Sequence, residues 1–192
     1  LHDYNEDDLI KRIAKYLDNS VIGLISDAGS PLISDPGFNL VKKFIKKNIF
    51  VTSVPGPTSI IPSLQLAGFA INSFIFFGFI PKNKSSAKLI ANIINDLDLT
   101  SVLFISGNRL KDFLEFLLNN RKVAICKELT KINETIIRGE VINIVDKIRK
   151  NEINLKGEFT VVVDKKEIKQ TKSVDNNIKI QASKLLKKYT LT

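Results

Sequence analysis

Hydrophobic residues recur along the chain with two spacings that alternate. Apolar positions three and four residues apart predict amphipathic helices, whereas short runs of β-branched and aromatic residues predict strands. In the first seventy residues this pattern predicts helices at 5–18, 37–47 and 58–68 and strands at 21–26 and 49–54. An alternating order of strands and helices is typical of a parallel sheet.

The same alternation continues after residues 68–72, which we interpret as a hinge. We expect strands at 74–79, 101–106, 122–129, 133–138 and 158–164, and helices at 84–97, 109–119 and 140–150. The predicted fold class is therefore α/β, with one domain over residues 1–70 and a second over 71–165. Residues 166–192 are a polar, lysine-rich tail with a short helical pattern at 180–189 and little apolar content for a core.

Two loops rich in small residues follow the first two predicted strands, at 27–37 and 55–59. In open α/β sheets ligands bind at the carboxyl ends of strands, and Ala28 and Gly29 would let a ligand approach the backbone. A plain turn with Asp35 as helix N-cap and Pro36 at the first helical position accounts for the end of the first loop, but not for its length. We therefore expect one cleft lined by both loops.

Composition limits the choice of function. Neither loop has the glycine pattern of a phosphate-binding loop, which argues against a nucleotide polyphosphate. No run approaches ~20 apolar residues, so a membrane span is not expected. No secretory signal is visible at the start of the sequence. The single cysteine, Cys126, lies in an apolar run and is predicted to be a buried core thiol, which fits a cytoplasmic protein.

The formal net charge of +9 is distributed unevenly. Residues 1–70 are neutral, residues 71–165 carry +4 and residues 166–192 carry +5. A basic surface attracts a phosphate backbone without selecting a sequence. Lysine-rich and isoleucine-rich chains also arise from the base composition of a genome, so both interpretations of the charge stay open.

Five short motifs occur in order along the chain. They are Asp-Ala-Gly-Ser-Pro-Leu-Ile-Ser-Asp-Pro-Gly at 27–37, Val-Pro-Gly-Pro at 54–57, Gly-Phe-Ile-Pro-Lys at 78–82, Glu-Leu-Thr-Lys at 128–131 with Glu-Thr at 134–135, and Lys-Gly-Glu at 156–158. In this order they resemble the tetrapyrrole methylase superfamily, and within it the branch that methylates ribose 2′-hydroxyl groups of small-subunit ribosomal RNA. The resemblance implies the two-domain class III methyltransferase fold, S-adenosyl-L-methionine as cofactor, small-subunit rRNA or the 30S ribosomal subunit as partner, and a homodimer.

The resemblance also implies where the cofactor binds. Its contacts would come from both loops and from the second domain, at Asp27, Ala28, Gly29, Ser30, Ile33, Thr58, Ser59, Ser106 and Leu129. Ordinary core packing is the alternative for Ile33 and Leu129. Helix capping is the alternative for Thr58 and Ser59, although a helix amino terminus also suits the carboxylate of the cofactor.

On the acceptor side the resemblance points to Arg109, Glu128, Lys131 and Glu134. Methyl transfer is an in-line displacement that needs alignment and no metal, whereas a ribose hydroxyl needs a group to take its proton. Arg109 and Lys131 would hold phosphate or ribose, and Glu128 or Glu134 would accept the proton. A surface ion pair is the alternative for Lys131 and Glu134.

The chain departs from the family's pattern in two places. Relatives carry an upstream segment with the first strand of the first domain, so we expect this chain to be an amino-terminally truncated piece whose first domain lacks that strand region. Arg109 also lacks the acidic and histidine neighbours of its usual motif. Two alternatives to rRNA methylation therefore stay open: a methylase of a tetrapyrrole or other small molecule, and a non-catalytic α/β module.

Overall fold

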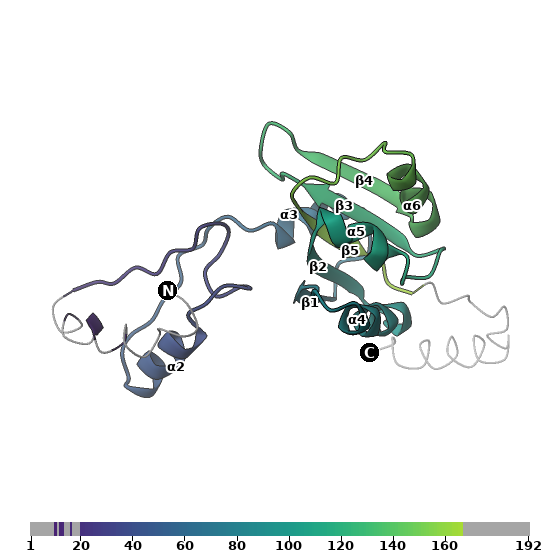
Figure 1. Cartoon of the computed structure of the whole chain (residues 1–192). Coiled ribbons are helices and arrows are strands. Elements are labelled where there is room, and N and C mark those ends of the chain that lie inside the picture. The colour runs from purple at the N-terminus through teal and green to yellow at the C-terminus, as the bar shows by residue number, and fades with distance from the viewer. Residues whose placement is uncertain (1–9, 11, 14–15, 17–19, 167–192) are drawn as a thin grey trace, which may run out of the picture.

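The computed structural model describes residues 10, 12–13, 16 and 20–166 (Figure 1). The helix expected at 5–18 lies almost entirely outside these residues, and the helical pattern at 180–189 lies wholly outside them. None of the described helices is long and apolar enough to cross a bilayer.

A five-stranded mixed sheet forms the centre of the molecule. Its strands, in chain order, are β1 (Phe74–Phe79), β2 (Thr100–Ser106), β3 (Lys122–Lys127), β4 (Thr135–Glu140) and β5 (Glu158–Val163). Their order across the sheet is β1-β2-β5-β3-β4, with β1 parallel to β2 and with β5 antiparallel to both of its neighbours. All five agree with the predicted strands to within two residues, because short runs of β-branched and aromatic residues suit a buried sheet.

Three helices cover one face of this sheet: α4 (Lys84–Asp96), α5 (Gly107–Leu114) and α6 (Val141–Arg149). The main core lies between them and the sheet residues that point to this side, such as Leu103, Ile105 and Ile125. Helix α5 ends five residues earlier than predicted. The side chain of Asn95 explains this difference, because it donates to the carbonyl of Phe116 and accepts from the amide of Leu118, which binds that segment to α4 as a turn.

The opposite face of the sheet is covered only in part. Helix α3 (Ile60–Ala67) packs on it through Leu64 and Ala67, against Val102, Ala124 and Val162 of the strands. Arg138 of β4 donates to the carbonyl of Leu66, so α3 is also bound to the sheet at its carboxyl end. The domain boundary at residue 70 stays a prediction, but α3 shares a core with the sheet that follows it.

The two strands predicted at 21–26 and 49–54 are wrong, and so is the parallel sheet expected from them. Both segments are extended without a strand partner among the described residues, and Val21, Ile25, Phe50 and Val54 are exposed. A strand forms only where a neighbour accepts and donates its backbone hydrogen bonds, and no local pattern can supply that neighbour.

Helix α2 (Phe38–Lys46) agrees with the predicted helix at 37–47 to within one residue at each end. Its N-cap is Gly37 at φ 130°, and no side chain caps it, so the interpretation of Asp35 as N-cap is wrong. Leu40 and Phe44 pack with Ile10 in a small cluster. Figure 1 shows α2 standing apart from the sheet, whereas α3 lies against it.

Candidate functional site

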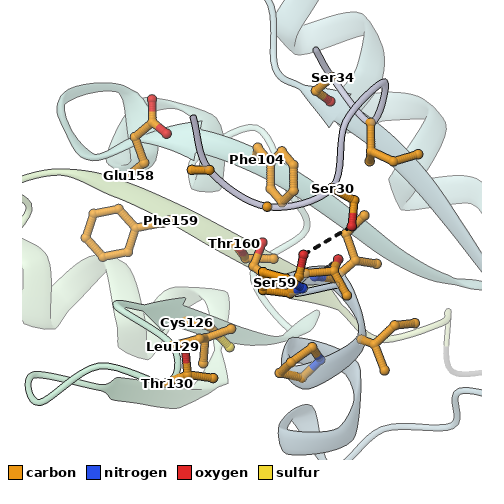
Figure 2. A pocket seen from close by; sticks show the side chains of 18 of the residues that line it. Ser30, Ser34, Ser59, Phe104, Cys126, Leu129, Thr130, Glu158, Phe159 and Thr160 are labelled. Atoms are coloured by element: carbon orange, nitrogen blue, oxygen red, sulfur yellow. Dashed lines mark hydrogen bonds between the residues drawn. The ribbon is translucent and has the colours of Figure 1, made fainter. Parts of the chain in front are cut away.

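A cavity of about 800 Å³ lies over the part of the sheet that α3 leaves uncovered. It is located at the carboxyl ends of β1, β2 and β3 and at the amino end of the antiparallel β5, the position at which α/β sheets bind ligands. Phe104, Cys126 and Thr160 of the sheet form its floor, below the loops that carry Ser30 and Ser59 (Figure 2). The cavity is lined by residues 27–30, 33–35, 56–62, 79, 104, 126, 128–131 and 158–160.

The first loop contacts both the second loop and the sheet. The Ser30 hydroxyl donates to the carbonyl of Pro57 at 3.1 Å, the hydrogen bond drawn in Figure 2. On the sheet side, the Ser34 side chain lies close to Gly78 of β1: its Oγ is 3.4 Å from the position that a Cβ would take on Gly78. Gly78 has a φ of +68°, and the pairing of β1 is irregular there. The cleft predicted between the two loops therefore exists, and the sheet closes its lower side.

Gly29 lies in this loop at φ +73°, and a Cβ built on it would meet no atom within 4 Å. A left-handed conformation favours glycine, and the open space beside it leaves the backbone accessible from the cavity. The Ser26 hydroxyl donates to the carbonyl of Gly29 at 2.9 Å and so holds the turn. At Gly29, therefore, no side chain covers the backbone, and a ligand in the cavity can contact it.

The second loop leads into α3, whose first residues line the cavity. The Thr58 hydroxyl accepts a hydrogen bond from the amide of Ile60 at 3.3 Å, whereas the Ser59 side chain makes no capping bond although Ser59 is the N-cap. The capping alternative therefore holds for Thr58 and not for Ser59. The amino end of α3 carries a partial positive charge that suits an anionic group in the cavity.

The third loop follows β3 and has an unusual backbone. Glu128 and Thr130 both have positive φ, at 50° and 67°. Lys131 forms an ion pair with Glu128 at 3.0 Å, so the ion-pair alternative holds for Lys131 but not for Glu134. Glu134 instead accepts a hydrogen bond from the backbone amide of Thr130 at 2.7 Å.

Strained backbone is concentrated around this cavity. Among the described residues, six non-glycine residues have positive φ, and four of them lie in the first and third loops: Leu32, Ser34, Glu128 and Thr130. The other two are asparagines next to helix carboxyl ends, where a left-handed conformation is ordinary. A left-handed conformation costs a non-glycine residue of order 1 kcal/mol, and such residues gather at ligand sites because the surrounding structure holds them there.

The structure brings ten of the thirteen predicted site residues to this cavity: Asp27, Ala28, Gly29, Ser30, Ile33, Thr58, Ser59, Glu128, Leu129 and Lys131. The other three lie outside its lining. Glu134 binds the backbone of the third loop, Ser106 is the last residue of β2, and Arg109 lies in the first turn of α5. Arg109 donates to the Ser106 hydroxyl at 3.0 Å and to the carbonyl of Ile80 at 2.8 Å.

Several lining residues escaped the sequence analysis. Glu158 belongs to a motif that was noted, and its place at the start of β5 brings it into the lining at the edge of the cavity (Figure 2). Phe79 and Phe104, whose ring centroids are 5.2 Å apart, belong to predicted strands. Nothing in an apolar strand distinguishes an aromatic residue that packs in the core from one that lines a cavity.

Cys126 is a buried free thiol, as predicted. Burial is the main cause that raises the pKa of Cys126 to about 11; Glu134 adds to this increase, and Arg138 opposes it. A thiol with this pKa stays protonated near neutral pH, so Cys126 forms part of the cavity floor without acting as a nucleophile. No group of three or more histidine, cysteine or acidic residues suited to a metal occurs in the described part of the chain.

Solved protein structures share this fold. Cobalt precorrin-4 methyltransferase, a cobalamin biosynthetic enzyme, is similar with a TM-score of 0.58 and 14% identity over 85% of this chain and 71% of that chain. Diphthine synthase has a TM-score of 0.58 and 13% identity over 85% of this chain and 68% of that chain. The fold is thus that of the class III methyltransferases.

The chain belongs to the tetrapyrrole (corrin/porphyrin) methylase family, whose profile matches residues 2–144. It is 37% identical over 167 residues to ribosomal RNA small subunit methyltransferase I of Halalkalibacterium halodurans, and 35% identical over 172 residues to the protein of that name from Thermotoga maritima. These matches cover 85% of this chain in both cases, 57% of the first relative and 76% of the second. The same-named protein of a Hydrogenobaculum species is 38% identical over 75% of this chain and 63% of its own length.

Proposed function

We propose that this protein transfers a methyl group from S-adenosyl-L-methionine to the ribose 2′-hydroxyl of a cytidine in small-subunit ribosomal RNA. The observation that carries the proposal is the meeting of the three motif-bearing loops at one cavity at the carboxyl ends of β1, β2 and β3. The relatives' name, ribosomal RNA small subunit methyltransferase I, supports the substrate class. The net charge of +9 is compatible with an RNA partner.

The cavity fits the proposed cofactor in size and chemistry. Its volume of about 800 Å³ lies within the usual range of ~300–1,000 Å³ for small-molecule sites. Apolar rings of Phe79, Phe104 and Phe159 line one part of it, and the amino end of α3 offers a positive potential for a carboxylate. The open space beside Gly29 allows a ligand to lie against the backbone.

We assign most of the predicted cofactor residues to direct contact and one to support. The contacts are Asp27, Ala28, Gly29, Ser30, Ile33, Thr58, Ser59 and Leu129, all of which line the cavity. Ser106 lies outside that lining, so we assign it the role of holding Arg109 at the end of β2. S-adenosyl-L-methionine supplies an electrophilic methyl carbon when bound, and the protein has to align the acceptor and receive its proton.

For the proton we propose Glu128. Glu128 lines the cavity, and its carboxylate forms an ion pair with Lys131 at 3.0 Å, which holds the carboxylate beside the site. Lys131 lies beside it with its side chain 66% exposed, where it can contact the ribose or a phosphate of the acceptor. Glu134 is committed to the backbone of Thr130, and its role in this proposal is to hold the loop.

The chain spans 57% and 63% of the length of the first two curated relatives that it matches, so the assembly around it is also a proposal. We propose that the amino-terminal domain over 1–70 and the carboxy-terminal domain over 71–165 close around the cofactor, and that the basic tail over 166–192 adds RNA affinity. We further propose a homodimer that acts in the cytoplasm on rRNA or the 30S subunit.

Mass analysis of small-subunit rRNA from cells that lack the gene tests the substrate. We expect one cytidine to lose its 2′-O-methyl group and to regain it when the gene is restored. If every 2′-O-methyl group persists, or if the purified protein methylates a tetrapyrrole and not RNA, the proposal is wrong. Calorimetric titration of S-adenosyl-L-methionine into the protein distinguishes both enzymes from a non-catalytic module, which would bind none.

A further inference from the structure

A second hollow lies on the opposite face of the sheet from the cavity. It has a volume of about 200 Å³ and is located where β1 and β2 end and α4 begins. Neighbouring residues of β2 separate the two spaces, because Phe104 lines the cavity and Ile105 lines the hollow. Arg109, which does not line the cavity, lines this hollow.

The lining of the hollow is predominantly positive. Lys82, Lys84 and Arg109 contribute three cations against the single carboxylate of Asp112, and the remaining lining is apolar. Lys84 and Asp112 are 3.4 Å apart with both side chains mostly exposed, so solvent screens their pairing. Lys82 has no ion-pair partner among the described residues. We call these four residues the cationic hollow.

Arg109 is held rigidly within the cationic hollow. Its Nε donates to the Ser106 hydroxyl and its Nη1 donates to the carbonyl of Ile80, so the plane of the guanidinium is fixed. Its Nη2 has no hydrogen-bond partner among the residues that the structure describes. A fixed guanidinium with free N–H groups loses little entropy when it binds an oxyanion, and its geometry matches a phosphate.

We propose that the cationic hollow binds a backbone phosphate of a polynucleotide. The net positive lining favours an anion, and the fixed N–H groups of Arg109 match phosphate oxygens. The cavity and the hollow lie on two faces of the same strand ends, so one strand could place a nucleotide in the cavity and a neighbouring phosphate in the hollow. The choice of RNA as the source of this phosphate rests on the proposed function, whereas the binding of phosphate does not.

Binding of a fluorescent single-stranded RNA oligonucleotide over a series of salt concentrations tests this proposal. We expect Lys82→Ala to weaken binding at low salt and to reduce the slope of log K against log[salt] by about 0.7, the value for one phosphate contact with a single strand. Lys147→Ala is the matched control, because it removes the same charge from α6, outside the hollow. Equal effects of the two variants would show only a general attraction between charges, and would overturn the proposal.

A second variant should have the opposite effect. Asp112→Asn removes the only carboxylate of the hollow and releases Lys84, so RNA should bind about two- to threefold more tightly. Unchanged or weaker binding would contradict the proposal. Competition with inorganic phosphate distinguishes a site for free phosphate from a site for the phosphate of a polynucleotide backbone. If millimolar phosphate displaces the oligonucleotide from the wild type as effectively as from Lys82→Ala, the hollow gives the oligonucleotide no advantage over free phosphate and does not select a polynucleotide.

Titration of S-adenosyl-L-methionine into the same proteins separates this proposal from the proposed function. Lys82 lies outside the cavity, so Lys82→Ala should bind the cofactor with the affinity of the wild type. If the protein binds RNA through the hollow but binds no cofactor, the proposed methyltransferase activity is wrong and the phosphate site in the hollow is supported. If the protein binds the cofactor but does not bind RNA through the hollow, the methyltransferase proposal is supported and the phosphate site in the hollow is wrong.

Discussion

The carboxylate of Glu134 accepts a hydrogen bond from the backbone amide of Thr130 at 2.7 Å, and Thr130 has the left-handed φ of 67°. A charged acceptor for that amide favours a backbone conformation that threonine otherwise avoids. Glu134 therefore stabilises the shape of the loop that places Glu128, Leu129 and Lys131 in the cavity lining. We therefore expect this carboxylate to hold the loop and not to accept the proton of the ribose.

Substitution of Glu134 should distinguish positioning from proton transfer. We expect Glu134→Gln to retain most of the methyl transfer, because an amide oxygen also accepts from Thr130. Glu134→Ala should weaken cofactor binding about fivefold, in line with ~1 kcal/mol for an exposed hydrogen bond. Hydrogen exchange at Thr130 should be fast only in the alanine variant. Loss of turnover in Glu134→Gln with the Thr130 amide still protected would identify Glu134 as the proton acceptor instead.

Gly29→Val should abolish cofactor binding while the protein stays folded. The branched side chain would occupy the open space beside Gly29, and a φ of +73° adds strain of about 1–2 kcal/mol for an L-residue. Gly23→Val is the control, since Gly23 also has no atom within 4 Å of a built Cβ, has no positive φ and lies outside the cavity. Calorimetric titration and thermal unfolding measure the two effects, and unchanged affinity in Gly29→Val would show that Gly29 serves only the turn.

Gly107→Ala should destabilise the fold far more than a typical glycine substitution. A Cβ on Gly107 would lie 1.7 Å from the carbonyl oxygen of Leu155, and the amide of Gly107 donates to the carbonyl of Gly157 at 2.8 Å. The segment before β5 would have to move away from α5, at a cost of about 3 kcal/mol or more. Urea denaturation measures this loss. In Gly139→Ala the nearest atom is a side-chain methyl at 3.5 Å, so the same measurement should show little change.

The buried thiol of Cys126 predicts a pH dependence of stability. Its pKa of about 11 in the folded protein is raised from 9.0, so folding favours the protonated form. The stabilisation is present below pH 9 and is lost as the pH rises towards 11. The free energy of unfolding should therefore fall more steeply over this interval in the wild type than in Cys126→Ala, which lacks the thiol. Parallel curves for the two proteins would show that burial does not shift this pKa.

The amino-acid sequence by itself determined the strands of the sheet and the order of the motif loops along it. Strands β2, β3 and β5 were predictable because each is a short, mostly apolar run with several buried residues. The cavity was predictable in outline because the carboxyl ends of strands and the small residues of 27–37 and 55–59 are visible in the sequence. Ten of the predicted site residues lie in its lining for this reason.

Only the tertiary structure decided which partners those elements found. The segments 21–26 and 49–54 have strand-like patterns, but a strand needs the backbone of a neighbour, and none is present among the described residues. The insertion of β5 between β2 and β3 brings Glu158 to the cavity, although it lies 30 residues beyond Glu128 in the chain. Helix α5 follows β2 on the hollow side of the sheet, so Arg109 lines the hollow, while ten of the predicted site residues lie in the cavity lining.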